Sequence, residues 1–294
     1  MTTSGPLDSL RSINVGGIHT GSDEDILFRL TSKQKNTRLI RKMDRTILGG
    51  TGIEVTRLGA GLFQIGTLEV EQGGRLLNEA LDAGINFLDT GECYSRSEEI
   101  IGRTIAHRRS EYFLATKAGH AVDANSRPVT LGVHGHRPWT TETVTHSIDR
   151  SLRRLGTDYV DLLQIHAYDT VWPLDDAVLQ AFCDAKQAGK ARFLGFSQEG
   201  RPAEQAVMSG LFDTLQVSFS LIDQRPRYRL LGLARDKGVG IIAKRPIANA
   251  VWGRSPSSGA NVGERSRAQH TVAHLMTNQG PIHGAPDDPI AMAL

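Results

Sequence analysis

Four residues with proton-handling side chains lie near the ends of short apolar runs in this chain. Asp89, Lys117 and His166 each end such a run, and Tyr94 lies in the segment that follows Asp89. Reduction of a carbonyl group by hydride needs a proton donor at the developing alkoxide and positioned hydrogen-bond donors around that oxygen. These residue types therefore predict a site that interconverts carbonyl and alcohol groups.

Each of the four residues has a definite use in that reaction. A tyrosine has a pKa of about 10 and is a poor acid unless a neighbouring cation lowers that pKa. Lys117 can supply the cation, and a buried lysine needs an acid such as Asp89 to stay charged away from water. His166 can orient a carbonyl group or relay a proton. Taken singly, each residue is as compatible with a structural role as with a catalytic one. Asp89 could cap a loop, and Lys117 could form a structural ion pair with it.

The elements that would position these residues alternate regularly from Arg45 onward. Short runs rich in apolar and β-branched residues predict strands buried on both faces, and helical stretches separate them. The seven predicted strands are Leu58–Ile65, Ile85–Asp89, Tyr112–Lys117, Tyr159–His166, Arg192–Ser197, Thr214–Phe219 and Gly240–Lys244. The six predicted helices are Gln72–Ala83, Ser97–Arg108 with Ser97 as its N-cap, Thr141–Leu155, Leu174–Ala188, Pro202–Ser209 and Arg227–Lys237.

So many strand–helix units in series favour a (β/α)₈ TIM barrel, which is built on a closed parallel sheet, over an open doubly wound sheet. No Gly-x-Gly-x-x-Gly turn follows the first strand, which argues against a Rossmann domain. The segment Arg45–Val55 predicts a hairpin ahead of the barrel. In a βα barrel the active-site groups lie at the carboxyl ends of the strands. Ser197 and Gln216, on the fifth and sixth strands, are therefore expected at the same mouth as the four residues above.

Three segments that contain these residues resemble the aldo-keto reductase family. They are Asn86–Tyr94, Leu114–Gly119 and Arg150–His166, and the resemblance as a whole runs from about Arg45 to about Trp252. It implies a (β/α)₈ barrel and a cytoplasmic oxidoreductase that reduces an aldehyde or ketone with hydride from NAD(P)H. NADPH is the expected cofactor, with NADH as the alternative, and a small carbonyl compound is the expected substrate.

The resemblance also implies a role for each residue in the site. Tyr94 would be the general acid in reduction and the general base in oxidation. Lys117, paired with Asp89, would lower the pKa of Tyr94, and His166 would orient the carbonyl group.

Further positions match those that bind the nicotinamide in this family. Ser197 and Gln216 match residues that hydrogen-bond its carboxamide, and Gln198 stands where the family usually has asparagine. Lys244 occupies a position that often holds an aromatic residue stacked on the nicotinamide. A lysine cannot stack in the same way, so Lys244 is expected to bind the cofactor differently.

Composition limits the other function classes. The chain has 294 residues and a formal net charge of +2, which gives no reason to expect nucleic acid or an acidic membrane surface as partner. Cys93 and Cys183 lie outside any C-x-x-C pattern, so we expect neither a disulfide framework nor a metal site. No stretch is apolar for long enough to span a bilayer, and the N-terminus lacks the apolar region of a secretory signal.

The two ends of the chain differ from residues 43–252, which are predicted to form the barrel. Residues 1–42 are polar, with acidic residues early and basic residues later, and are predicted to be a disordered leader. A transit peptide fits less well because such peptides are poor in acids, and Met43 as the natural start is a further alternative. Residues 253–294 are predicted to be a divergent, largely irregular tail in which no eighth strand is evident.

Two other hypotheses follow from the unusual C-terminal region. The chain could be a catalytically impaired barrel that acts as a binding or regulatory subunit, or a truncated reductase whose open sheet edges promote aggregation. The identity of the substrate and the oligomeric state are left open by the sequence.

Overall fold

The computed structural model describes residues 43–119, 140–166, 175–220 and 222–246. The leader predicted over residues 1–42, the tail predicted over residues 253–294 and the predicted lack of an eighth strand all lie outside the described residues.

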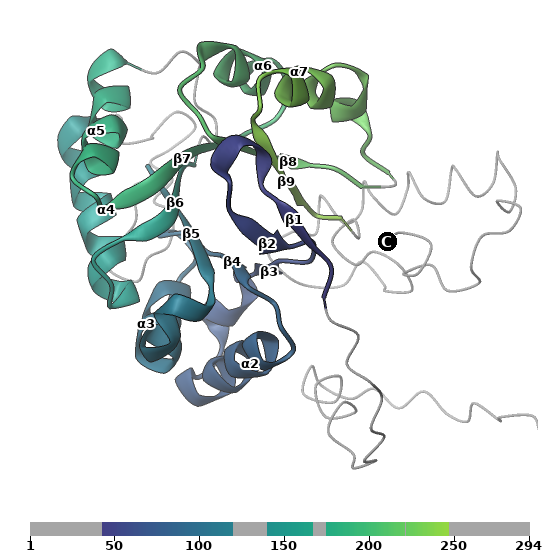
Figure 1. The fold of residues 1–294 in the computed structure, drawn as a ribbon. Helices are drawn as coiled ribbons and strands as arrows, with labels where there is room; N and C mark the ends of the chain where they lie inside the picture. The colour runs from purple at the N-terminus through teal and green to yellow at the C-terminus, as the bar shows by residue number, and fades with distance from the viewer. Residues whose placement is uncertain (1–42, 120–139, 167–174, 221, 247–294) are drawn as a thin grey trace, which may run out of the picture. The chain divides into compact units, whose positions relative to one another are not determined.

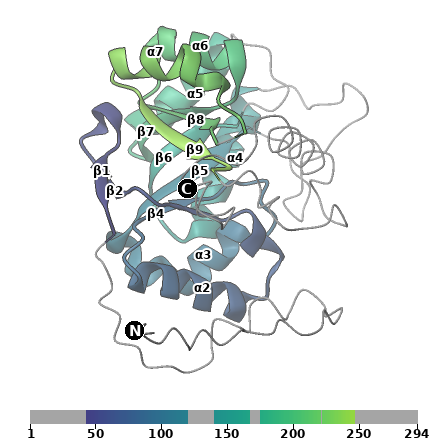
Figure 2. The ribbon, with the colours of Figure 1, turned by 90° about the vertical axis from the view of Figure 1, so that its right-hand side faces the viewer.

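Seven parallel strands form one sheet in the order β3-β4-β5-β6-β7-β8-β9, in which each strand pairs with the next along the chain. Together they make a nearly closed barrel, and Figures 1 and 2 show the helices around its outside. The predicted fold class, a (β/α)₈ barrel, is confirmed. The strands are β3 (Ala60–Gly61), β4 (Phe87–Asp89), β5 (Phe113–Ala118), β6 (Val160–Ile165), β7 (Ala191–Ser197), β8 (Thr214–Ser218) and β9 (Gly240–Lys244).

One α-helix lies between each pair of consecutive barrel strands. The helices are α2 (Val70–Asp82), α3 (Ser97–Ile105), α4 (Thr141–Leu155), α5 (Asp176–Gln187), α6 (Gly200–Ser209) and α7 (Leu230–Asp236). Shorter 3-10 helices are η1 (Gly49–Thr51), η2 (Gln64–Thr67), η3 (Ala106–Glu111) and η4 (Arg225–Tyr228). This alternation produces the parallel pairing, because each helix returns the chain to the start of the next strand.

The main hydrophobic core lies between the strands and the helices that cover them. Leu114 of β5 and Leu163 of β6 belong to the same buried cluster as Ile101 of α3, Ile148 of α4 and Phe182 of α5. Every residue of β5 and β6 is buried, as expected for parallel strands that are covered on both faces.

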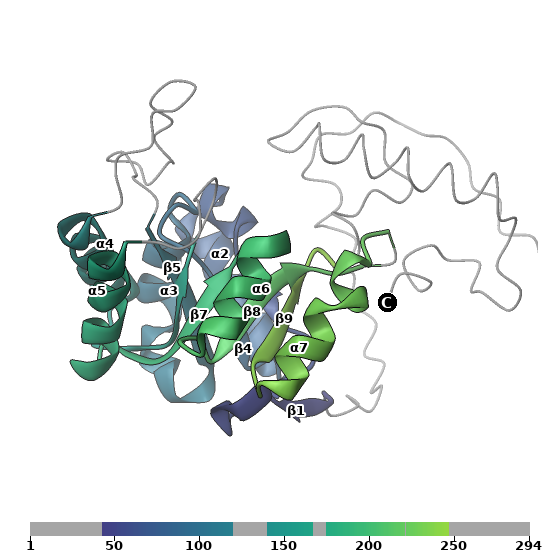
Figure 3. The same cartoon turned by 90° about the horizontal axis from the view of Figure 1, so that it is seen from above.

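A hairpin closes the amino end of the barrel. It consists of β1 (Arg45–Ile47), η1 and β2 (Glu54–Thr56), and its residues Leu48 and Val55 form a second buried cluster with Phe87 and Phe113, the first residues of β4 and β5. A Cβ atom at Gly49 would lie 2.2 Å from the backbone nitrogen of Gly240, so only glycine permits this close approach. Figures 1 and 3 show the hairpin at one end of the strands, which leaves the carboxyl ends for the site.

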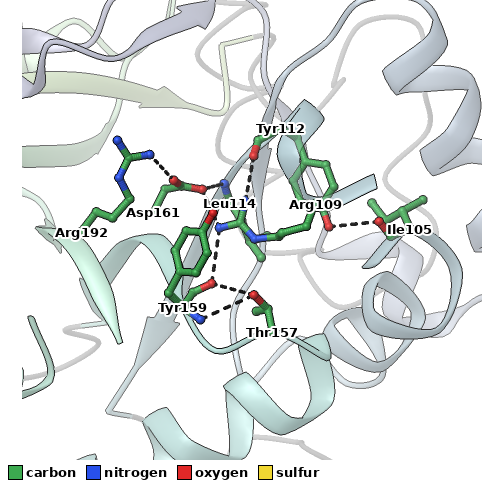
Figure 4. A network of polar contacts seen from close by, with 8 residues as sticks. All are labelled: Ile105, Arg109, Tyr112, Leu114, Thr157, Tyr159, Asp161 and Arg192. Carbon is green, nitrogen blue, oxygen red and sulfur yellow. Dashed lines mark hydrogen bonds and ion pairs between the residues drawn. The ribbon is translucent and has the colours of Figure 1, made fainter. Parts of the chain in front are cut away.

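A buried carboxylate joins three elements near the start of β6. Asp161 is 3% exposed, and its oxygens accept hydrogen bonds from Arg109 at 2.7 Å, Arg192 at 2.7 Å and the Leu114 backbone nitrogen at 2.8 Å. Figure 4 shows the Asp161 side chain between the two guanidinium groups. These contacts connect β6 to β5, β7 and η3 at the amino end of the barrel, away from the carboxyl ends where active sites lie.

Two local predictions differ from the structure. The first barrel strand is only Ala60–Gly61, and the predicted remainder toward Ile65 turns into η2. Ser97 is not the N-cap of α3: Arg96 occupies that position, and the Ser97 hydroxyl instead donates to the Leu62 carbonyl at 2.8 Å. The buried carbonyl needs a donor at this point, and that tertiary contact outweighs the local capping preference.

Candidate active site

The four residues with proton-handling side chains lie at the carboxyl ends of adjacent strands. Asp89 is the last residue of β4, Lys117 is the penultimate residue of β5, and His166 directly follows β6. Tyr94 lies in the turn between β4 and α3. The parallel register brings these strand ends to one edge of the sheet.

Lys117 forms a buried ion pair at the centre of this group. Its side chain is fully buried, and its Nζ donates to Asp89 Oδ2 at 2.6 Å and to the Thr90 carbonyl at 2.7 Å. Burial by itself lowers the pKa of Lys117, but the charges and hydrogen bonds of Asp89 and Tyr94 together outweigh burial, and the pKa is raised. Lys117 is therefore a cation at neutral pH.

Tyr94 lies directly beside that cation. The Lys117 Nζ is 4.7 Å from the centroid of the Tyr94 ring, and the ring also makes edge contacts with Phe63 at 5.1 Å and His166 at 5.9 Å. Burial of the phenol raises the pKa of Tyr94, the charge of Lys117 lowers it, and the charge of Asp89 raises it. The contribution of Lys117 has the predicted sign, but burial outweighs it and the net pKa is raised.

His166 has a thiol as a neighbour. Its Nδ1 lies 3.3 Å from the Sγ of Cys93, the residue before Tyr94. Burial raises the pKa of Cys93 to about 12, so this group is a thiol at neutral pH. A thiol that donates to Nδ1 leaves the proton of a neutral imidazole on Nε2.

Gln164 is a member of the site that the sequence reasoning missed. It lies on β6 opposite Lys117 of β5, and its Nε2 donates to Asp89 Oδ1 at 2.8 Å. Gln164 lies within the segment Arg150–His166 that resembles the family, and its polar amide on a strand of mostly apolar residues was the signal that could have pointed to it.

The turn that holds Tyr94 is anchored by two buried acids. The Glu92 backbone nitrogen donates to the Lys117 carbonyl, and the Glu92 carboxylate accepts from Ser147 and Arg150 of α4. Glu98, at the start of α3, accepts from the Thr116 hydroxyl at 2.6 Å. Burial raises the pKa of both carboxyl groups, that of Glu98 to about 7.

Two predicted cofactor residues meet on adjacent strands. Ser197 ends β7 opposite Gln216 of β8, and the Ser197 hydroxyl donates to the Gln216 Oε1 at 3.1 Å. Both side chains are buried, and half-buried Gln198 directly follows Ser197. The Ser197 hydroxyl and the two glutamine amides match the donors and acceptors of a carboxamide.

Lys244, the last residue of β9, is held by a second residue that the sequence reasoning missed. Its Nζ lies 3.1 Å from Oε1 of Glu199, and burial lowers the pKa of Lys244. The Glu199 carboxylate also accepts from the backbone nitrogen and the hydroxyl of Ser218. The cation is therefore fixed by an acid from the loop after β7.

The described residues bear on two other kinds of feature, metal centres and membrane spans. Among those residues, no three His, Cys, Asp or Glu side chains form a group that could hold a metal ion. Across the same ranges, no helix is both long and apolar enough to cross a membrane.

Comparisons with known proteins agree on one family. The model of the Aldo/keto reductase family matches residues 57–279, which extends past Trp252. The chain is 32% identical to the uncharacterized oxidoreductase YqkF of Bacillus subtilis, covering 74% of this chain and 70% of YqkF. It is 29% identical to L-galactose dehydrogenase of Arabidopsis thaliana, covering 70% and 66% of the two chains. The holo form of aldo-keto reductase AKR11C1 from Bacillus halodurans superposes with a TM-score of 0.65 at 26% identity, covering 85% of this chain and 80% of that one.

Proposed function

The chain belongs to the aldo-keto reductase family and is an NAD(P)-dependent oxidoreductase, and from this premise we propose that it reduces an aldehyde or ketone to an alcohol with NADPH. The observation that carries the proposal is the placement of Lys117, which is bonded to Asp89 and lies against the Tyr94 ring. A buried cation beside a phenol is what a tyrosine general acid requires.

Tyr94 is the proton donor in this proposal. When the nicotinamide is bound it supplies hydride to the carbonyl carbon, and the Tyr94 Oη–H gives its proton to the carbonyl oxygen. Lys117 stabilises the tyrosinate that remains, and Asp89 keeps Lys117 charged in its buried position. In the oxidative direction the Tyr94 oxygen accepts the proton of the alcohol.

His166 orients the carbonyl group. Its Nδ1 lies 3.3 Å from the Cys93 Sγ, and with the thiol as donor the imidazole proton is on Nε2, the atom that we propose donates to the carbonyl oxygen. Two donors at that oxygen stabilise the charge that develops as hydride arrives.

The nicotinamide carboxamide is held by Ser197, Gln198 and Gln216 in this proposal. The donor set fits that group, since the hydroxyl of Ser197 and the amides of Gln198 and Gln216, gathered from two adjacent strands, offer partners for both its carbonyl and its amino group. Lys244 contributes a cation that Glu199 fixes at the same mouth. NADPH is proposed over NADH from the resemblance to the family, and calorimetric titration with each nucleotide distinguishes them.

The experiment compares the wild-type chain with Tyr94→Phe. The variant should bind NADPH with unchanged affinity, and its kcat for a panel of aldehydes and ketones should fall by about 10²- to 10⁴-fold, because only the proton donor is lost. Full activity in Tyr94→Phe would show that another group donates the proton.

A second candidate function is a binding or regulatory subunit that has kept the site without turnover. Lys244 favours it, because it stands at a position where the family often has a stacking aromatic residue. Such a chain would bind NADPH and yet reduce no member of the carbonyl panel, whereas turnover by the purified protein would exclude it.

A further inference from the structure

We propose that Gln164 is a positioning residue for Asp89: its side-chain amide holds one oxygen of the carboxylate and leaves the other oxygen to Lys117. The inference rests on the proposed function, since it concerns the same proton-transfer site. Gln164 touches neither the reacting atoms nor the cofactor in this scheme, and it acts through Asp89.

The contacts divide the Asp89 carboxylate between two strands. Gln164 Nε2 is 2.8 Å from Oδ1, and Lys117 Nζ is 2.6 Å from Oδ2. Lys117 and Gln164 are paired in the register of β5 and β6, so their side chains leave the sheet on the same face. Each carboxylate oxygen is thus hydrogen-bonded to a different strand, which restricts the rotation of the carboxylate.

The burial of Gln164 shows that packing alone does not account for an amide at this position. The side chain is fully buried, and within the described residues its Oε1 has no hydrogen-bond partner. A buried amide costs free energy unless it is hydrogen-bonded, and a leucine or methionine would fill the same space without that cost. Within the described part of the chain, the hydrogen bond to Asp89 offsets the free-energy cost of burying the Gln164 amide.

The neighbouring strand makes room for this side chain. Gly195 of β7 is paired with Gln164, and a Cβ atom at Gly195 would lie 3.0 Å from the Gln164 Cγ and 2.6 Å from the Thr214 Oγ1. A larger residue at position 195 would displace Gln164 toward the site. The absence of a side chain at Gly195 therefore supports the position of the amide.

The consequence for catalysis is a change in the acidity of Tyr94. The titratable and charged groups around Tyr94 are Lys117, Asp89, Cys93 and His166. The charge of Lys117 lowers the pKa of Tyr94 and that of Asp89 raises it. Without the amide, the Asp89 carboxylate loses a hydrogen-bond donor that offsets its negative charge. The carboxylate can also rotate, so its contact with Lys117 is less well oriented. Both effects raise the pKa of Tyr94.

The test measures that pKa directly in the full chain, without a substrate. Tyrosinate absorbance in the ultraviolet is titrated for wild type, Gln164→Met and Gln164→Leu, and each curve is corrected with the same protein carrying Tyr94→Phe. We expect both replacements to raise the pKa of Tyr94 by about one pH unit. Thr214→Val, which removes a buried hydroxyl from the same interior without touching Asp89, should leave it unchanged.

A pKa of Tyr94 that is the same in both Gln164 variants as in wild type would overturn the inference. A second measurement asks whether the effect passes through Asp89. In an Asp89→Asn background, Gln164→Met should cause no additional shift, and a shift of the original size there would also overturn it. The titration of the Gln164 variants does not depend on the turnover of Tyr94→Phe. Full activity in Tyr94→Phe would therefore contradict the proposed function and leave this inference to be decided by the titration.

Discussion

Lys117 is the residue on which the other site groups converge. Its ammonium is bonded to Asp89 and to the Thr90 carbonyl, it faces the Tyr94 ring, and its side chain is fully buried. An ammonium in such a place is stable only with its acid partner. The pair that we propose tunes the acidity of Tyr94 is therefore also expected to be a condition for folding at this end of the barrel.

Replacing one partner of this pair should cost more than replacing both. We expect Lys117→Met to lower the free energy of unfolding by about 3 kcal/mol, because it leaves the Asp89 carboxylate largely buried and unpaired. The double variant Asp89→Asn/Lys117→Met should recover most of that loss in chemical denaturation but none of the lost kcat. Equal stability of the single and double variants would contradict the ion-pair description.

The sequence pointed to four candidate site residues but not to the partners that hold them. Asp89, Tyr94, Lys117 and His166 could be found because each stands beside a strand end within a recognisable segment. Gln164 and Glu199 could not, because their importance comes from contacts with Asp89 and Lys244 that only the folded barrel creates. The net pKa of Tyr94 was missed for the same reason, since it depends on how far the phenol is buried.

At the scale of elements, α3 and the turn before it are fixed to the barrel by Glu98. This carboxyl group is 1% exposed, accepts from Thr116, and has its pKa raised to about 7 by burial. Since the ordinary value is about 4.3, the native state holds a proton that the unfolded state has lost between these two pH values. The stability that Glu98 contributes therefore falls as pH rises from about 4.3 to 7.

Glu98→Gln should remove this pH dependence. The free energy of unfolding of the variant, relative to that of wild type, should rise by up to about 4 kcal/mol between about pH 4.3 and pH 7 and stay constant above pH 7. Denaturant titrations across this range measure it. Glu99→Gln is the matched control. Because Arg96 and Arg103 lower the pKa of Glu99, the free energy of unfolding of this variant relative to wild type should not rise between about pH 4.3 and pH 7. A flat difference for Glu98→Gln would contradict a native-state proton on Glu98.

The packing of α3 against α4 makes a second prediction at this scale. A Cβ atom at Gly102 of α3 would lie 2.0 Å from the backbone oxygen of Arg154 in α4, whereas one at Gly232 of α7 would meet no described atom within 4 Å. Gly102→Ala should lower Tm, with a loss of about 2 kcal/mol, while Gly232→Ala should raise stability by about 0.5 kcal/mol. A neutral Gly102→Ala would show that the two helices separate easily.

The fold itself was largely predictable, because the periodicity of apolar residues marks the strands and helices, and a glycine follows every predicted helix except Ser97–Arg108. The strand at Ala60–Gly61 was overestimated: the apolar run there continues into η2, and periodicity alone cannot separate a short strand from the turn that follows it. The role of Ser97 was misjudged because a tertiary acceptor, the Leu62 carbonyl, competes with the local cap.

At the scale of the whole molecule, one barrel gathers the candidate site residues at the same edge of its sheet. The hairpin of β1 and β2 closes the amino end, and the carboxyl ends of β4 to β9 carry the proton-transfer residues and the proposed nicotinamide contacts. The family model matches residues 57–279, so the match spans these strands and part of the C-terminal region.

The most direct test of the central claim, that this chain moves hydride from NADPH to a carbonyl carbon, is isotope transfer. The purified full-length chain is incubated with NADPH deuterated at C4 of the nicotinamide and a panel of aldehydes and ketones, and the alcohols are analysed by mass spectrometry and NMR. We predict deuterium on the carbinol carbon of the product, and greatly reduced product with Tyr94→Phe. Binding of NADPH without any transfer of deuterium, or alcohol formed without the label, would contradict the account.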